Sequence, residues 1–185
     1  MWYTVGVEIV PTDAKQLAQH PLFRTLELGT QHDLLARFVV FTVAPHEPLI
    51  RAGEKDSSLL LLLSGSADVY VRKAGQRFRV ARLHAGELMG EMAFFDPQLA
   101  RSADVVQGPE PGLIALLHSD VYWDLVRAHD AGAEVIEKLV LDSLARRIRS
   151  TNELLGDLLD QHQKGGLMDA LGRLFGRKGV GHRSR

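Results

Sequence analysis

The sequence contains no cysteine among its 185 residues. Disulfide bonds, thiolate catalysis, zinc fingers and cysteine-ligated iron–sulfur clusters are therefore excluded. An excess of charge of either sign is also lacking, because 22 Lys and Arg residues stand against 23 Asp and Glu residues and give a formal net charge of −1. A chain this close to neutrality has no overall electrostatic bias toward nucleic acid or membrane.

Long apolar runs are lacking too, since none exceeds the five residues of "LLLLL" at 59–63. A membrane-spanning helix needs about 20 apolar residues. The N-terminal "MWYTVGVEIV" has no basic region, and Glu8 interrupts its apolar residues, so it does not match a secretory signal. We therefore expect a cytoplasmic protein.

Short apolar segments alternate with turn residues between about residues 38 and 118. Segments such as "FVVFTV", "ADVYV" and "GLIALL" are separated by pairs such as Ser64-Gly65 and Ala74-Gly75. Many short strands with regular turns are typical of a β-sandwich or a barrel-like roll. Residues 1–37 before this region are expected to form an N-terminal arm and short helices.

Helical spacing replaces the strand pattern from residue 119, where Ser119 is the expected N-cap, to about residue 160. Two series recur every seven residues within it, in the seam pattern of a coiled coil: Leu141, Ile148 and Leu155, and Leu144, Thr151 and Leu158. This seam predicts a homodimer through the 134–160 helix; packing of the helix on its own β domain is the alternative. The polar Thr151 either pairs with its symmetry mate or meets a bound polar group.

The stretch "GELMGEMAFFDPQLARSADVV" at 86–106 is the candidate ligand site. Gly90 lets the backbone approach a ligand, and the amides after it can form a nest for an anion. Arg101 would provide the positive charge that a buried phosphate requires, while Glu91 would accept hydrogen bonds from sugar hydroxyls. Phosphate, ribose and an apolar wall indicate a nucleotide. From spacing alone, a hairpin with a solvated Glu91–Arg101 salt bridge is the favoured interpretation.

Two motifs favour a ligand site over the solvated hairpin. Gly90-Glu91-Met92-Ala93 and Arg101-Ser102-Ala103 resemble the phosphate-binding cassette of the cyclic-nucleotide-binding domain family, and "LIRAGEKDSSLLLLLSG" resembles a second signature of that family. The likeness extends from about Leu22 to Leu159. It implies an α+β fold: an antiparallel β-roll of the jelly-roll or double-stranded β-helix kind, short N-terminal helices and a long C-terminal dimerisation helix, as in catabolite-activator-type regulators.

The resemblance also assigns binding roles. Glu91 would accept the ribose 2′-hydroxyl, and Arg101 and Ser102 would hold the cyclic phosphate. Other residues matched to the family's binding positions are Leu83 and Met89 on the apolar side, Gly90, Met92, Ala93 and Ala103 in the cassette, and Arg147, Thr151 and Asn152 on the helix. Arg147 would pair with Glu91, and Thr151 and Asn152 would contact the purine, one from each subunit.

Three positions depart from the family pattern: Asp56 replaces a small residue, Phe94 replaces an aliphatic one, and Pro45-His46 replaces a glycine-containing turn. The winged helix-turn-helix of the family's transcription regulators does not follow the long helix, so we expect no direct DNA binding.

The tail at 161–185 is basic and amphipathic, with one apolar stripe formed by Leu167, Leu171, Leu174 and Phe175. Such a tail can dock on an acidic membrane or on a partner protein. A short helix that packs on its own domain, followed by a frayed end, is favoured over docking to either.

The eight histidines form no pair at i, i+3 or i, i+4, and no catalytic arrangement is visible, so we expect neither a metal, nor a cofactor, nor an enzyme. The sequence predicts a homodimeric receptor for a cyclic purine nucleotide, most simply cAMP, that signals to a downstream protein. The alternatives are a receptor for cGMP or cyclic di-GMP, an interaction scaffold with a degenerate pocket, and a DNA-binding regulator that uses the basic tail.

Overall fold

The computed structural model describes residues 8–9, 17–20 and 23–175. It forms two units, Met1–Ser143 and Leu144–Arg185. Most of the expected N-terminal arm and first helix, residues 1–7, 10–16 and 21–22, and the last ten residues of the tail, 176–185, lie outside the described residues.

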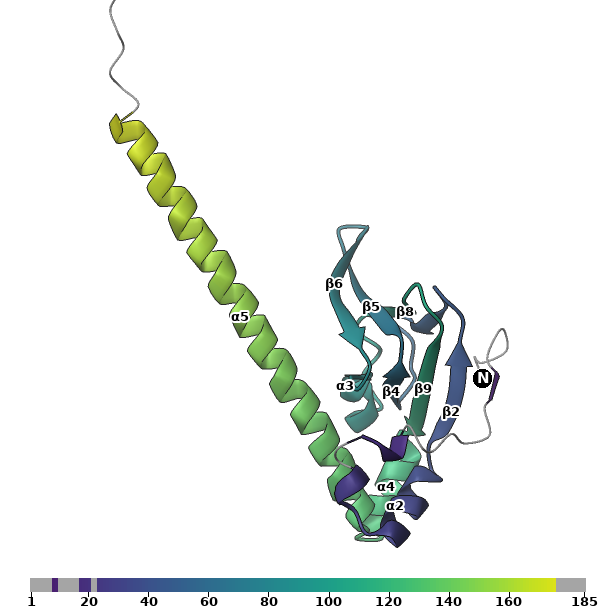
Figure 1. Cartoon of the computed structure of the whole chain (residues 1–185). Helices are drawn as coiled ribbons and strands as arrows, with labels where there is room; N and C mark the ends of the chain where they lie inside the picture. Colours follow the sequence, from purple (N-terminus) through teal and green to yellow (C-terminus); the bar gives the residue numbers. More distant parts are fainter. Residues whose placement is uncertain (1–7, 10–16, 21–22, 176–185) are drawn as a thin grey trace, which may run out of the picture. The chain divides into compact units, whose positions relative to one another are not determined.

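Nine strands in the described part of the first unit pair into two antiparallel sheets (Figure 1). The five-stranded sheet has the order β1-β2-β9-β4-β7, and the four-stranded sheet has the order β3-β8-β5-β6. The strands are β1 (Glu8–Ile9), β2 (Val39–Val43), β3 (Pro48–Ile50), β4 (Ser58–Ser64), β5 (Ser66–Lys73), β6 (Gln76–His84), β7 (Leu88–Met89), β8 (Asp104–Gln107) and β9 (Gly112–His118). This arrangement confirms the predicted antiparallel β-roll.

The leucine run forms β4, which lies between β9 and β7 in its sheet and is buried on both faces over Leu59–Leu62. Leu60 and Leu62 point into the core between the two sheets, while Leu59 and Leu61 point to the opposite face and are also buried. Helix α3 (Glu91–Phe95) packs against β4. A strand covered on both faces carries a continuous apolar run rather than an alternating one.

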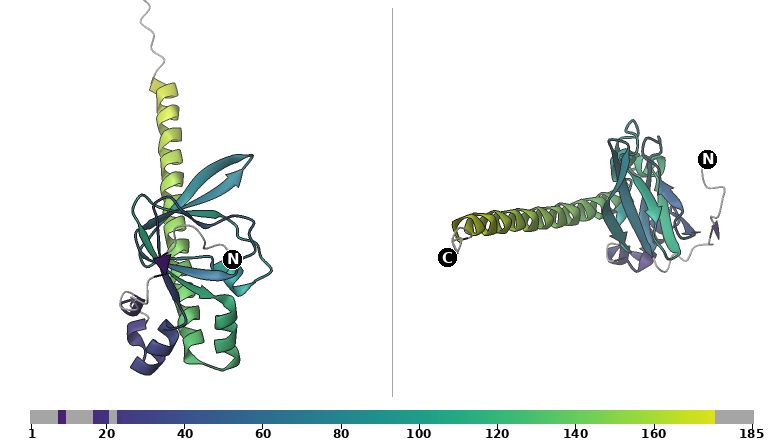
Figure 2. Two further views of the ribbon diagram at one scale, coloured as in Figure 1. Left: turned by 90° about the vertical axis from the view of Figure 1, so that its right-hand side faces the viewer. Right: turned by 90° about the horizontal axis from the view of Figure 1, so that it is seen from above.

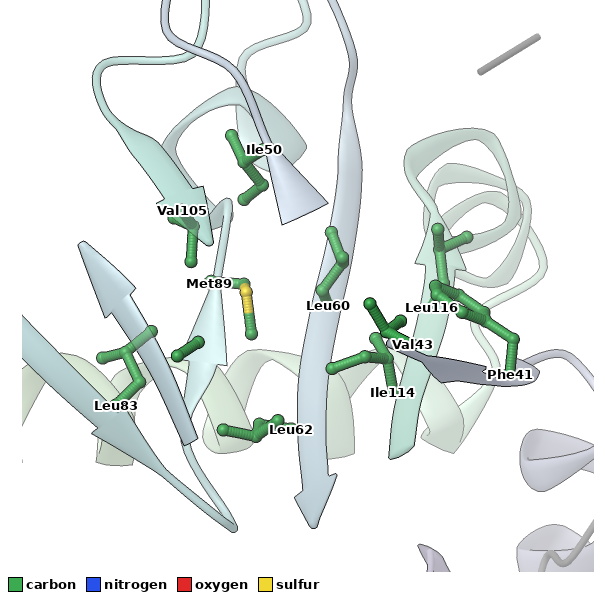
Figure 3. Packing of buried hydrophobic residues seen from close by; sticks show 11 residues of the cluster. Phe41, Val43, Ile50, Leu60, Leu62, Leu83, Met89, Val105, Ile114 and Leu116 are labelled. Atoms are coloured by element: carbon green, nitrogen blue, oxygen red, sulfur yellow. The ribbon is translucent and has the colours of Figure 1, made fainter. Parts of the chain in front are cut away.

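The core between the sheets contains the inward-facing side chains of both (Figure 3). Its buried members are Phe41, Val43, Ile50, Leu60, Leu62, Ala67, Leu83, Met89, Val105, Ile114 and Leu116. Leu83 and Met89, which are two of the predicted pocket residues, are 4% and 2% exposed there. Their side chains therefore stabilise the roll next to the cassette.

The β5–β6 hairpin ends in the tight turn that the Ala74-Gly75 pair predicted. Both residues have positive φ, 51° and 78°, and they join the paired residues Lys73 and Gln76. Two left-handed residues in a two-residue loop match the twist of antiparallel strands.

Helices gather at one end of the roll (Figures 1 and 2). They are η1 (Phe23–Thr25), α2 (Leu28–Leu35) and α4 (Ser119–Arg127), followed by the first part of α5 (Ala131–Phe175). Helix α4 packs against β9, and Ile136, Leu139 and Val140 of α5 are buried. Ser119 is the first helical residue rather than the predicted N-cap, which is His118 in extended conformation.

Helix α5 is the element of the second unit, from Leu144 onward. It runs to Phe175 and so continues through the boundary expected at residue 160. No proline interrupts this stretch, and each glycine in it costs only about 1 kcal/mol. Among the described residues, no helix has the length and apolar character needed to cross a membrane.

Candidate functional site

The cassette segment, residues 86–106, leads from β7 in one sheet to β8 in the other through a turn that requires glycine. Gly90 has φ of +90° and caps the five-residue helix α3. A Cβ atom at this position would lie 2.8 Å from the carbonyl oxygen of Ser58 and would overlap Nη1 of Arg101. Glycine is therefore required both by the backbone conformation and by the space available.

The Arg101 side chain points inward and is only 2% exposed. Its guanidinium donates hydrogen bonds from Nη1 to the Gly90 carbonyl at 2.8 Å and from Nη2 to the Ser58 carbonyl at 2.6 Å. Nη2 also donates to Oδ2 of Asp56 at 2.7 Å. The arginine is therefore held beside the turn at Gly90, where the sequence predicted an anion site, and it does not form a solvated surface pair.

Main-chain hydrogen bonds hold Arg101 against a loop that is distant in sequence. The Gly53 amide donates to the Arg101 carbonyl at 2.8 Å, and the Arg101 amide donates to the Glu54 carbonyl at 2.9 Å. The Ala52 amide donates to Oδ1 of Asp104 at 2.9 Å. That hydrogen bond is the main reason why the pKa of Asp104 lies below its usual value. The two sequence motifs thus meet in space and position one guanidinium.

Asp56 provides the negative charge that a buried guanidinium requires. Burial raises the pKa of the Asp56 carboxyl, but the hydrogen bond and charge of Arg101, with the hydrogen bonds from Ser58, outweigh burial and leave the pKa below its usual value. Asp56 is therefore ionised at neutral pH. Arg101 and Asp56 therefore form an ion pair within the site without any ligand.

One donor of Arg101 has no acceptor. The Nε atom is buried and forms no hydrogen bond within the described residues. A buried donor without a partner costs about 1–3 kcal/mol. An anion that places an oxygen at Nε would remove this cost, and the positive charge of the group favours such an anion.

A hydrogen-bonded chain extends from Asp56 to the start of α4. Ser58 donates to Oδ1 of Asp56 from its amide at 3.1 Å and from its hydroxyl at 2.8 Å. The same hydroxyl lies 3.2 Å from Nδ1 of His118, the N-cap of α4. Oδ1 of Asp56 is thus hydrogen-bonded to the first residue of β4, while Oδ2 accepts the hydrogen bond from Arg101.

Aromatic packing joins the cassette helix to α4. Phe94, one of the departures from the family pattern, is fully buried, and its ring centroid lies 5.3 Å from that of Tyr122. The Tyr122 hydroxyl donates to Oε1 of Glu137 on α5 at 2.8 Å. Burial, followed by the hydrogen bond and charge of Glu137, raises the pKa of Tyr122 to about 12. Phe94 therefore replaces an aliphatic residue with a ring that packs directly against α4.

The other predicted cassette residues lie around Arg101 with different exposures. Glu91 and Ala103 are partly buried, Ala93 is 2% exposed, Met92 is 60% exposed, and Ser102 is exposed. The hydrogen bond from Arg101 to Gly90 directly joins the two halves of the predicted motif. The ligand roles assigned to Glu91 and Ser102 stay predictions.

The predicted helix residues lie on α5 in the second unit. Arg147 is partly buried, and Thr151 and Asn152 are exposed. Their predicted contacts with Glu91 and with a purine stay predictions. Along the helix, Ile148 and Leu155 of the predicted seam are 61% and 52% exposed.

Sequence reasoning missed the role of Asp56 as the partner of Arg101. The residue stood out only as a charged replacement for a small one. The separation of 45 positions between Asp56 and Arg101 hid the pairing, because only the antiparallel roll brings their loops together. No group of His, Cys, Asp and Glu within the described ranges is arranged to hold a metal ion.

Comparison with known proteins finds a family model that matches this segment. Residues 40–129, which include Asp56 and Arg101, match the family model described as the cyclic nucleotide-binding domain. The chain is similar in structure to a cyclic nucleotide-binding domain from Methylobacillus flagellatus KT, with a TM-score of 0.70 and 20% identity over 80% of this chain and 86% of that chain.

Two further solved structures share the fold. The Thermus thermophilus Catabolite Activator Protein has a TM-score of 0.59 and 29% identity; the match covers 76% of this chain and 63% of that chain, so it spans less than two thirds of that protein. The regulatory domain of Toxoplasma gondii PKA, solved with cAMP, has a TM-score of 0.54 and 15% identity over 69% of this chain and 48% of that chain. Among the curated proteins, none matches the sequence significantly.

Proposed function

Because residues 40–129 match the family model described as the cyclic nucleotide-binding domain, we propose that this protein is a receptor for a cyclic purine nucleotide, most simply cAMP. Its activity is reversible binding rather than catalysis. Ligand bound at the cassette would favour one arrangement of the helices over another, and a partner protein would recognise the favoured arrangement. This mechanism needs only a difference in ligand affinity between the two arrangements.

The buried guanidinium of Arg101 is the observation that supports this proposal most directly. It lies against Gly90 with a side chain that is 2% exposed, and its Nε atom has no acceptor among the described residues. A charge-assisted hydrogen bond contributes about 1.5–3 kcal/mol. Two such bonds to a cyclic phosphate, with contacts to the sugar and base, are sufficient for micromolar binding.

Isothermal titration calorimetry tests the proposal with cAMP, cGMP and cyclic di-GMP on the full chain. We expect a dissociation constant in the micromolar range for one of the three. Arg101→Lys keeps the positive charge but loses the planar fork, so it should weaken binding at least about tenfold. Absence of binding by all three ligands at millimolar concentration would overturn the proposal.

We further propose that α5 forms a homodimer along its heptad seam. Leu141, Ile148 and Leu155 repeat at seven-residue spacing and are 65%, 61% and 52% exposed in the single chain. Three large apolar side chains on one stripe match the seam of a two-stranded coiled coil. A second copy of the helix would cover them most simply.

Sedimentation equilibrium tests the dimer. Ile148→Asp should shift the mass toward the monomer, because it places a charge in the apolar seam. Ser150→Asp adds the same charge at an exposed position outside both seam series and should leave the mass unchanged. A monomeric wild-type protein, or equal behaviour of the two variants, would contradict the proposal.

An interaction scaffold with a degenerate pocket is the second candidate, and one contact favours it. The 2.7 Å ion pair between Arg101 and Asp56 already supplies the arginine with an anion. On this hypothesis the protein binds no cyclic nucleotide, and Arg101→Ala leaves capture of the partner intact. Loss of ligand-dependent partner capture in that variant would instead support the receptor.

A further inference from the structure

The hydrogen-bonding geometry of Arg101 raises a specific problem for a phosphate ligand. A guanidinium can donate two parallel hydrogen bonds along either of two edges, Nε with Nη2 or Nη1 with Nη2. Nη2 belongs to both edges. Its two hydrogens are already donated, one to the Ser58 carbonyl at 2.6 Å and one to Asp56 at 2.7 Å. A phosphate therefore has no complete edge to bind.

We propose that Asp56 is an internal anion that competes with the phosphate for Arg101 and so sets the affinity of the site. The proposal rests on the proposed nucleotide-binding function. Binding of the ligand displaces the Asp56 carboxylate from Nη2, and the released hydrogen completes an edge for the phosphate. The positive charge of Arg101 is thus balanced by one anion before binding and by another afterward.

Asp56 is the partner of Nη2 that can leave. Its side chain is 40% exposed and belongs to the loop before β4, so water can solvate the released carboxylate. The Ser58 carbonyl belongs to the main chain of β4 and is fixed by the sheet. After displacement, Oδ1 of Asp56 keeps the hydrogen bonds from the amide and hydroxyl of Ser58.

The opposite role would be that Asp56 orients Arg101 for the ligand. Orientation of the guanidinium does not depend on Asp56 alone, because Nη1 donates to the Gly90 carbonyl and Nη2 to the Ser58 carbonyl. Those two main-chain acceptors hold the plane of the guanidinium when the carboxylate leaves. The two roles predict opposite changes in affinity when Asp56 is replaced.

Calorimetric titration with cAMP and with cGMP distinguishes them, on the full chain at neutral pH. Asp56→Ala should lower the dissociation constant at least about tenfold, which corresponds to 1.4 kcal/mol. Asp56→Asn keeps an acceptor but loses the charge, and should give a smaller decrease. The control is Glu54→Ala, which removes the same charge from the same loop. Its carboxylate lies near Arg51, so the dissociation constant should stay within about twofold of wild type.

Each outcome decides a different point. Tighter binding by both Asp56 variants, with the control unchanged, supports the competition. Weaker or unchanged binding by Asp56→Ala, while wild type binds, overturns the competition and leaves the receptor intact. Equal gains in Glu54→Ala and Asp56→Ala overturn it too, because they reveal only a general effect of charge. No binding by any variant overturns the receptor itself. If Asp56→Ala fails to fold, as judged by thermal unfolding, Asp56→Asn alone decides the direction.

Discussion

Replacement of Gly90 by alanine tests the geometry of the cassette. The new methyl group would enter space already taken by Nη1 of Arg101 and would lie 2.8 Å from the Ser58 carbonyl oxygen. The backbone at Gly90 also has φ of +90°, which disfavours any residue with a Cβ atom. The variant therefore combines backbone strain with displacement of the buried guanidinium.

The two effects have separable magnitudes. A left-handed conformation costs a non-glycine residue about 1–2 kcal/mol. Movement of the guanidinium breaks its 2.8 Å hydrogen bond to the Gly90 carbonyl, and a hydrogen bond from a charged group contributes about 1.5–3 kcal/mol. Gly90→Ala should therefore lower the free energy of unfolding by about 2.5–5 kcal/mol. That is a large share of the 5–15 kcal/mol typical of a domain.

Urea unfolding measures this change, and Gly86→Ala is the matched control. Gly86 has the same φ of +90°, but a Cβ atom there would meet nothing within 4 Å. The control should lose only the 1–2 kcal/mol of backbone strain. Nucleotide affinity should fall in the Gly90 variant alone. Equal losses of stability in both variants, or unchanged binding by Gly90→Ala, would refute the close packing of Arg101 against this turn.

Two pH-dependent contacts give further predictions. Burial, then the hydrogen bond to Glu137, raises the pKa of Tyr122 to about 12 from 10.0, so the stability from this contact is complete below pH 10 and is lost as the pH rises toward 12. Comparison of the tyrosinate absorbance of wild type and Tyr122→Phe during alkaline titration should show this late ionisation, and the variant should be about 0.5–1.5 kcal/mol less stable at neutral pH. The hydrogen bond from Arg82 lowers the pKa of Asp68 below 3.8 despite burial, so its contribution is present above pH 3.8 and is lost as the pH falls further. Urea unfolding at decreasing pH should show a smaller acid-induced loss of stability for Asp68→Asn than for wild type.

The β-roll could be predicted from sequence because its determinants are local. Turn pairs such as Ala74-Gly75 separate the strands, and the leucine run of β4 reflects burial on both faces. Helix α3 was not predicted, since five residues after a glycine carry too little periodicity. Helix α5 extends past residue 160, where the sequence placed the start of the tail, because glycines weaken a helix without ending it.

The candidate site was predictable only in part. Gly90 and Arg101 were singled out together, and the structure joins them by a hydrogen bond. The pairing of Arg101 with Asp56 was not, because it depends on loops that meet only after the sheets have formed. Local patterns indicate which residue types a site contains; they do not show how two distant side chains pair.

The main-chain bonds between Gly53, Glu54 and Arg101 have a consequence for how the domain assembles. They close a ring of nearly fifty residues. Closing so large a ring costs conformational entropy, and the contacts offset that cost only after the ring has closed. The contacts around Arg101 should consequently be among the last parts of the roll to form during folding. Hydrogen–deuterium exchange at the Gly53 and Arg101 amides that is faster than exchange in the central strands would be its signature in the native state.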